Sequence, residues 1–160
     1  MLRILRWIKA AEKKFCFFDL KPKEPESLAD MVKRDAHNRA KTTVLVVDDD
    51  PAVRDSLKFM LELEGFRVRL YAGGEELMKE RDIPDHVCLV VDQVMPGMSR
   101  LETIDAVRHR GCYHPAVLVV SSPNLKVRHS AKERGIAVVE KPFLEYTLID
   151  AIANAVAPHP

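Results

Sequence analysis

The stretch Val44-Leu45-Val46-Val47-Asp48-Asp49-Asp50-Pro51 sets the architecture that the rest of the chain follows. Its four apolar residues, three of them β-branched, are typical of a strand buried on both faces, as in a parallel sheet. Burying Asp48 and Asp49 in a core would be very costly, so we expect the strand to end at these acids, where solvent begins. Three acids at the end of a buried strand indicate a site for a cation.

The chain beyond residue 43 alternates between strand-like and helix-like patterns. Apolar segments typical of strands lie at 44–47, 66–70, 87–91, 116–120 and 136–139, and a segment with helical spacing follows each of them. Five strands that alternate with five helices predict an α/β fold with a parallel sheet covered on both faces. Because crossovers are right-handed, we expect a doubly wound, flavodoxin-like (CheY-like) sheet with the strand order 2-1-3-4-5.

That strand order places acids from two strands at one point. The first and third strands are neighbours at the topological switch point, and the third strand is followed by Asp92. Ligands of such sheets bind beyond the carboxyl ends of the strands at this point. We therefore expect Asp48, Asp49 and Asp92 to converge there, with Lys141 leaving the fifth strand on the same edge.

The predicted cluster indicates phosphoryl chemistry with Mg²⁺. Two carboxylates about 4 Å apart repel by about 4 kcal/mol at an effective dielectric constant near 20, so a third carboxylate calls for a divalent cation or protons. Oxygen ligands at an exposed edge suit Mg²⁺, which also binds phosphate oxygens. Asp92 stands alone at its strand end, so we predict that it is the nucleophile toward phosphorus, while Asp48 and Asp49 hold the metal.

Residues 44–157 resemble the receiver domain of two-component response regulators, of the single-domain type (CheY-like or FixJ-like). Three pieces in chain order carry the resemblance: Val46-Val47-Asp48-Asp49-Asp50, then Val91-Asp92-Gln93-Val94-Met95-Pro96-Gly97-Met98-Ser99, then Val139-Glu140-Lys141-Pro142-Phe143. The resemblance implies that a sensor histidine kinase or a phosphotransfer protein donates a phosphoryl group to Asp92. It also implies that Lys141 pairs with the phosphoryl oxygens, and that the implied Mg²⁺ ligands are Asp49, Asp92, Asp48 through water, and the carbonyl of Val94.

The resemblance also implies a cis peptide bond before Pro142, and it fails at the switch positions. Val120 stands where family members carry a Thr or Ser, and Val138 stands where they carry an aromatic residue. Ser121 comes one place late, so either it contacts the phosphoryl group through a shifted loop or the output mechanism differs.

The segment before residue 44 is predicted to be a basic extension and linker. Residues 1–43 carry 11 Lys/Arg against 6 Asp/Glu, whereas the rest carries 14 against 18. Residues 1–18 have the spacing of a basic amphipathic helix, which predicts weak contact with an anionic membrane surface or a partner; a flexible arm or a true start at Met31 are the alternatives. Ser27 is expected to cap a polar helix through about Arg39, with little apolar surface to hold it.

Composition excludes several classes of protein. The mildly acidic domain is no obvious nucleic-acid binder. Three Cys without a CxxC pair fit free thiols in the cytoplasm, and no apolar run approaches the length of a membrane span.

Only 18 residues follow Pro142, so we expect a stand-alone receiver that is not an enzyme and that signals through contact with a downstream protein or a second copy of itself. Two alternatives stay open: a pseudo-receiver that binds partners independently of phosphorylation, and a haloacid-dehalogenase-like phosphatase, which the D-x-D spacing of Asp48 and Asp50 permits.

Overall fold

The computed structural model describes residues 27–92, 100–110, 114–142 and 146–157. The chain divides into two units, Met1–Met31 and Val32–Pro160, and the second unit contains the whole sheet. The boundary that the sequence predicts between extension and receiver domain, at residue 44, stays a prediction.

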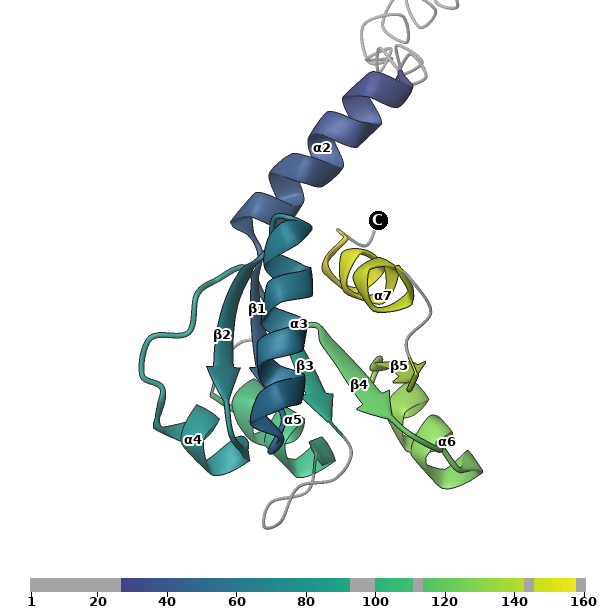
Figure 1. The fold of residues 1–160 in the computed structure, drawn as a ribbon. Coiled ribbons are helices and arrows are strands. Elements are labelled where there is room, and N and C mark those ends of the chain that lie inside the picture. Colours follow the sequence, from purple (N-terminus) through teal and green to yellow (C-terminus); the bar gives the residue numbers. More distant parts are fainter. Residues whose placement is uncertain (1–26, 93–99, 111–113, 143–145, 158–160) are drawn as a thin grey trace, which may run out of the picture. The chain divides into compact units, whose positions relative to one another are not determined.

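The second unit is a five-stranded parallel sheet with helices on both faces (Figure 1). The strands are β1 (Thr43–Val47), β2 (Arg67–Tyr71), β3 (Val87–Asp92), β4 (Ala116–Val120) and β5 (Ala137–Glu140), in the order β2-β1-β3-β4-β5. The helices that follow them are α3 (Pro51–Leu63), α4 (Gly74–Lys79), α5 (Arg100–Arg108), α6 (Leu125–Glu133) and α7 (Thr147–Val156). The predicted fold class and strand order are confirmed, and strand boundaries differ from the predicted ones by about one residue.

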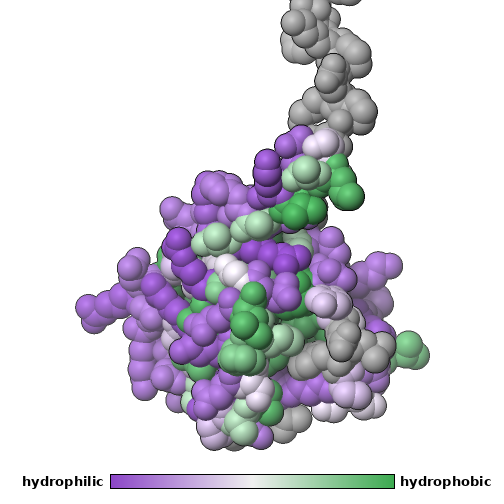
Figure 2. All heavy atoms as spheres, turned by 45° about the horizontal axis from the view of Figure 1, so that its top comes forward, coloured by the Kyte–Doolittle hydropathy of each residue, from purple (hydrophilic) through white to green (hydrophobic). Residues whose placement is uncertain are grey.

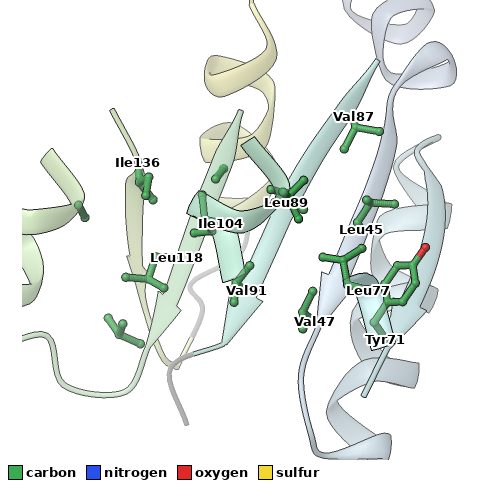
Figure 3. Packing of buried hydrophobic residues seen from close by; sticks show 14 residues of the cluster. Leu45, Val47, Tyr71, Leu77, Val87, Leu89, Val91, Ile104, Leu118 and Ile136 are labelled. Carbon is green, nitrogen blue, oxygen red and sulfur yellow. The ribbon is translucent and has the colours of Figure 1, made fainter. Parts of the chain in front are cut away.

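Alternating residues of the central strands fill two cores. One core lies between the sheet and the helices α4, α5 and α6 (Figure 3). The strands contribute Leu45, Val47, Leu89 and Val91 to it, and the helices contribute Leu77 and Ile104. Val44, Val46, Cys88 and Val90 face α3 and α7 on the opposite side of the sheet. Because both faces of β1 and β3 are covered, these strands read as unbroken apolar runs, as expected of a parallel sheet.

The α3 helix has clear signals at both ends. Pro51 occupies its first turn, and Asp50 caps it by accepting hydrogen bonds from the N–H groups of Ala52 (2.8 Å) and Val53 (3.4 Å). At the other end Gly65 takes φ +88°, and the Phe66 N–H donates to the Leu61 carbonyl (3.1 Å). This is a Schellman ending, in which Gly65 supplies the residue with positive φ that stops the helix.

The α2 helix (Leu28–Lys41) precedes the sheet. Ser27 caps it by accepting from the Asp30 N–H (3.2 Å), as the sequence predicts. Its last turn is held by polar contacts: Arg39 Nη1 lies 2.6 Å from Glu64 Oε2, and the Arg39 guanidinium stacks 5.9 Å from the centre of the Phe66 ring. The anchor is thus an arginine rather than the apolar surface that the sequence lacks.

On the face that Figure 2 shows, the described residues are mostly hydrophilic, with small hydrophobic areas between them. The large hydrophobic side chains that are exposed are Leu28, Val32, Phe59, Leu63, Leu125 and Tyr146. Within the described residues, no helix combines the length and apolar character needed to cross a membrane.

Candidate functional site

The acids predicted to converge do so at the carboxyl edge of the sheet. β1 and β3 pair in parallel with Val47 opposite Val91, so the residues that follow them, Asp48 and Asp92, come side by side. One carboxylate oxygen from each of Asp48, Asp49 and Asp92 lies within 4.8 Å of the others. Asp48 is buried, Asp92 is partly buried and Asp49 is exposed, so the cluster runs from the core to the solvent.

Lys141 brings an ammonium group into this cluster. Its Nζ lies 3.1 Å from Asp92 Oδ1 and 3.6 Å from Asp48 Oδ2. The backbone positions it: the Lys141 N–H donates to the Val120 carbonyl (2.7 Å) at the end of β4, and the peptide bond to Pro142 is cis, as the resemblance implies. Lys141 therefore reaches inward from the end of β5 to both Asp48 and Asp92.

Asp48 is fixed by its neighbours at every polar atom except one. Its N–H donates to the Tyr71 carbonyl (3.2 Å), and its own carbonyl accepts from Arg54 Nη1 (2.6 Å). Oδ1 accepts from the Asp50 N–H (2.9 Å). Oδ2 is buried and has no hydrogen-bond partner among the described residues. A buried carboxylate oxygen in this state is costly unless a further ligand meets it.

The electrostatics of the cluster also call for a cation. Burial raises the pKa of Asp48, and the nearby charges of Asp92 and Asp49 raise it further, against the lowering effects of the Asp50 N–H and Lys141. Three carboxylates lie together and the Lys141 ammonium group contacts two of them, so the ionised cluster keeps a surplus negative charge. A cation bound beside Asp48 would favour the charged form of its carboxylate.

The residues present fit Mg²⁺. Asp48, Asp49 and Asp92 offer hard oxygen ligands at a solvent-accessible edge, and the buried Asp48 Oδ2 accepts no hydrogen bond from the described residues, although Lys141 Nζ lies 3.6 Å away. When bound there, Mg²⁺ would neutralise negative charge on phosphate oxygens next to Asp92. Val94, whose carbonyl the resemblance adds to the ligands, lies outside the described residues.

The residues at the predicted switch positions differ from the acids, because no described side-chain contact joins them to the cluster. Val120 is fully buried, and it meets the site through its carbonyl rather than its side chain. Ser121 is exposed directly after β4, and Val138 packs at the edge of the core that faces α4, α5 and α6. The sequence gives no signal for Arg54, because a side chain that bonds a carbonyl leaves no trace in hydrophobic periodicity.

Comparison with known proteins identifies the family. Residues 44–153 match the response regulator receiver domain. The chain belongs to this family. Among curated relatives, the C4-dicarboxylate transport transcriptional regulatory protein DctR of Rhodobacter capsulatus is 33% identical over 120 residues, which are 73% of this chain and 61% of DctR. The transcriptional regulatory protein FixJ of Azorhizobium caulinodans is 33% identical over 110 residues, 68% of this chain and 52% of FixJ.

Solved receiver structures agree with this fold. The crystal structure of FixJ-N superposes with a TM-score of 0.66 at 30% identity, covering 74% of this chain and 96% of FixJ-N. The chemotaxis protein CheY4 of Vibrio cholerae gives 0.62 at 26% identity, covering 71% of this chain and 98% of CheY4. The chain spans 52% to 61% of the length of the first curated relatives, so their whole-protein activities do not transfer to it.

Receiver domains accept a phosphoryl group on an aspartate in two-component signalling and bind Mg²⁺ at an acidic pocket. Among the described residues of this receiver domain, the acidic cluster consists of Asp48, Asp49 and Asp92.

Proposed function

We propose that the receiver domain accepts a phosphoryl group on Asp92 from a sensor histidine kinase or a phosphotransfer protein, with Mg²⁺ held by Asp48, Asp49, Asp92 and the Val94 carbonyl. The observation that carries the proposal is the contact of 3.1 Å between Lys141 Nζ and Asp92 Oδ1, made inside a cluster of three acids. An acid beside an ammonium group and a metal site can attack phosphorus while both cations meet the charge on the phosphoryl oxygens.

Asp92 is a better acceptor than its neighbours. The Asp48 side chain is only 2% exposed and its Oδ1 is already engaged, whereas the Asp92 side chain is 12% exposed. Asp49 is exposed, and the described contacts of Lys141 go to the other two acids. In the proposed step an Asp92 oxygen bonds to phosphorus, the bond from phosphorus to the donor histidine nitrogen breaks, and that nitrogen keeps the electron pair.

Two residues are proposed to bind the transferred group. Lys141, freed from Asp92 Oδ1 by the reaction, pairs with the phosphoryl oxygens. Ser121 is the exposed hydroxyl nearest in sequence to the end of β4, and we propose that it adds a hydrogen bond to the same group. We also propose that the reaction takes place in the cytoplasm.

The output is proposed to pass through protein contact, to a downstream partner or to a second copy of the chain. Val120 and Val138 carry neither the hydroxyl nor the aromatic ring that the family uses as a switch, so the surface change on phosphorylation must arise elsewhere. The same observation favours a second candidate function, a pseudo-receiver that binds its partners whether or not it is phosphorylated.

Labelling with radioactive acetyl phosphate or a phosphorylated kinase tests the proposal. We expect Mg²⁺-dependent labelling of the wild type and of Asp55→Asn, a matched control at an exposed acid of α3, and none of Asp92→Asn. Equal labelling of Asp92→Asn removes Asp92 as the acceptor. A wild type that binds Mg²⁺ and is not labelled by either donor favours the pseudo-receiver.

A further inference from the structure

Arg54 lies in α3, and its side chain turns back to the acid cluster. Its Nη1 donates to the Asp48 carbonyl at 2.6 Å, and the contact is partly buried. A hydrogen bond from an ionised donor is shorter and stronger than a neutral one, and the planar guanidinium fixes its direction. The contact goes to the backbone of Asp48, whereas Lys141 contacts the carboxylate of the same residue.

The backbone of Arg54 makes a second hydrogen bond to the segment of acids that precedes α3. The Arg54 N–H donates to the Asp50 carbonyl (3.0 Å), and Asp50 in turn caps the first turn of α3. Asp49 thus lies between one residue held by the Arg54 side chain and another held by the Arg54 main chain. Two of the three acids that precede α3, Asp48 and Asp50, therefore have their carbonyl groups bonded to Arg54.

These contacts restrict Asp48 Oδ2, the carboxylate oxygen that accepts no hydrogen bond from the described residues. With the Asp48 N–H, carbonyl and Oδ1 all engaged, the Asp48 side chain cannot turn without breaking a hydrogen bond, and Oδ2 stays directed into the cluster. Groups held ready for a metal in this way bind it without first paying for their own ordering.

We infer that Arg54 is a positioning residue for the divalent-cation site: its side chain holds the peptide of Asp48 so that Asp48 Oδ2 and the Asp49 carboxylate are set for the metal. The inference deepens the proposed function and rests on its metal site. It assigns Arg54 no contact with the phosphoryl group or the metal, so its effect is on cation affinity first and on phosphoryl transfer through that affinity.

Calorimetric titration of the full chain with MgCl₂, without any phosphodonor, tests the inference. Arg54→Met keeps the length of the side chain and removes its donors, and we expect Mg²⁺ affinity to fall about 10-fold, the lower end of the effect of losing a partner that orients a metal ligand. Arg54→Lys restores a donor and is expected to recover most of the loss. Lys58→Met, at an exposed site on the same helix, is the matched control and should bind as the wild type does.

The rate of labelling, measured over a range of Mg²⁺ concentrations up to saturation, gives the second readout. A positioning role predicts that the Mg²⁺ concentration for half-maximal labelling rises in Arg54→Met while the maximal rate stays near that of the wild type. Should Arg54→Met fail to fold, Arg54→Gln, which keeps a neutral donor, takes its place.

The inference is overturned if Arg54→Met or Arg54→Gln binds Mg²⁺ within twofold of the wild type, if Arg54→Lys binds no better than Arg54→Met, or if the wild type binds no Mg²⁺. A wild type that binds Mg²⁺ but takes no label contradicts the proposed function alone, and the affinity comparison then still decides the role of Arg54.

Discussion

The two ends of α3 show opposite treatments of charge. Next to its first turn three carboxylates lie together, and a single ammonium group, that of Lys141, contacts the cluster. The buried Asp48 Oδ2 has no hydrogen bond among the described residues. At its last turn a single carboxylate, Glu64, meets a single guanidinium, Arg39, at 2.6 Å. The ion pair of Arg39 and Glu64 links two structural elements, whereas an excess of carboxylates at a strand end is typical of a site that binds a ligand.

The energetic consequences differ in the same way. The side chains of Arg39 and Glu64 are 28% and 29% exposed, so the contribution of this pair is expected to lie within the range of about 0.2–1 kcal/mol for surface pairs. The surplus charge at the near end costs stability until a cation arrives. Substitutions at the two ends should therefore change stability in opposite directions, which the following predictions exploit.

The largest effect is expected from Lys141→Met, which removes the only ammonium group that the described residues bring to the acids. Loss of one charged group that stabilises a transferred group typically costs 10²–10³ in rate, and we expect the labelling rate to fall about 100-fold at saturating Mg²⁺. Lys126→Met, at an exposed position of α6, is the control. A rate within threefold of the wild type would remove Lys141 from the reaction.

An intermediate effect is expected from Asp92→Asn in urea unfolding with EDTA. The substitution removes the repulsion of Asp92 by two acids and its attraction to one ammonium group, so we expect a gain of about 1 kcal/mol in the free energy of unfolding. Saturating Mg²⁺ should reverse the order, because the wild type gains the binding free energy and the variant has lost a ligand. If the variant is less stable than the wild type in EDTA, the cluster carries no surplus repulsion.

The smallest effect is expected at the other end of α3. A double-mutant cycle with Arg39→Met and Glu64→Gln should give a coupling of about 0.5 kcal/mol toward stability, and the same value with Mg²⁺ as with EDTA. A parallel cycle at Lys58 and Glu62, a more exposed pair at 4.0 Å, should give less. A coupling at Arg39 and Glu64 that depends on Mg²⁺ would mean that the two ends of the helix do not act separately.

The sequence predicts the acid cluster beside the first turn of α3, and both boundaries of this helix, better than it predicts the ion pair at the last turn. Asp48 and Asp92 could be placed together because two unbroken apolar runs and a right-handed crossover force their strands to be neighbours. Pro51 and Gly65 could be read as helix boundaries because each acts through its own backbone geometry. These signals are local, or they depend only on topology.

The contacts of Arg39 and Arg54 could not be predicted in this way. Each arginine crosses between elements and bonds a group whose position depends on the finished fold: a carboxylate at the end of α3 for Arg39, and a backbone carbonyl for Arg54. In the sequence both residues read as ordinary polar positions on a helix. The sequence predicts α2 only through about Arg39, and the helix ends two residues later, at Lys41.

Locating the phosphoryl group tests the central claim most directly. After reaction of the full chain with acetyl phosphate and Mg²⁺, peptide mass spectrometry should find one added phosphoryl group, on the peptide that contains Asp92, and none when EDTA replaces Mg²⁺. A phosphoryl group on Asp48 or Asp49, or one that reaches Asp92 equally well in EDTA, would contradict the account.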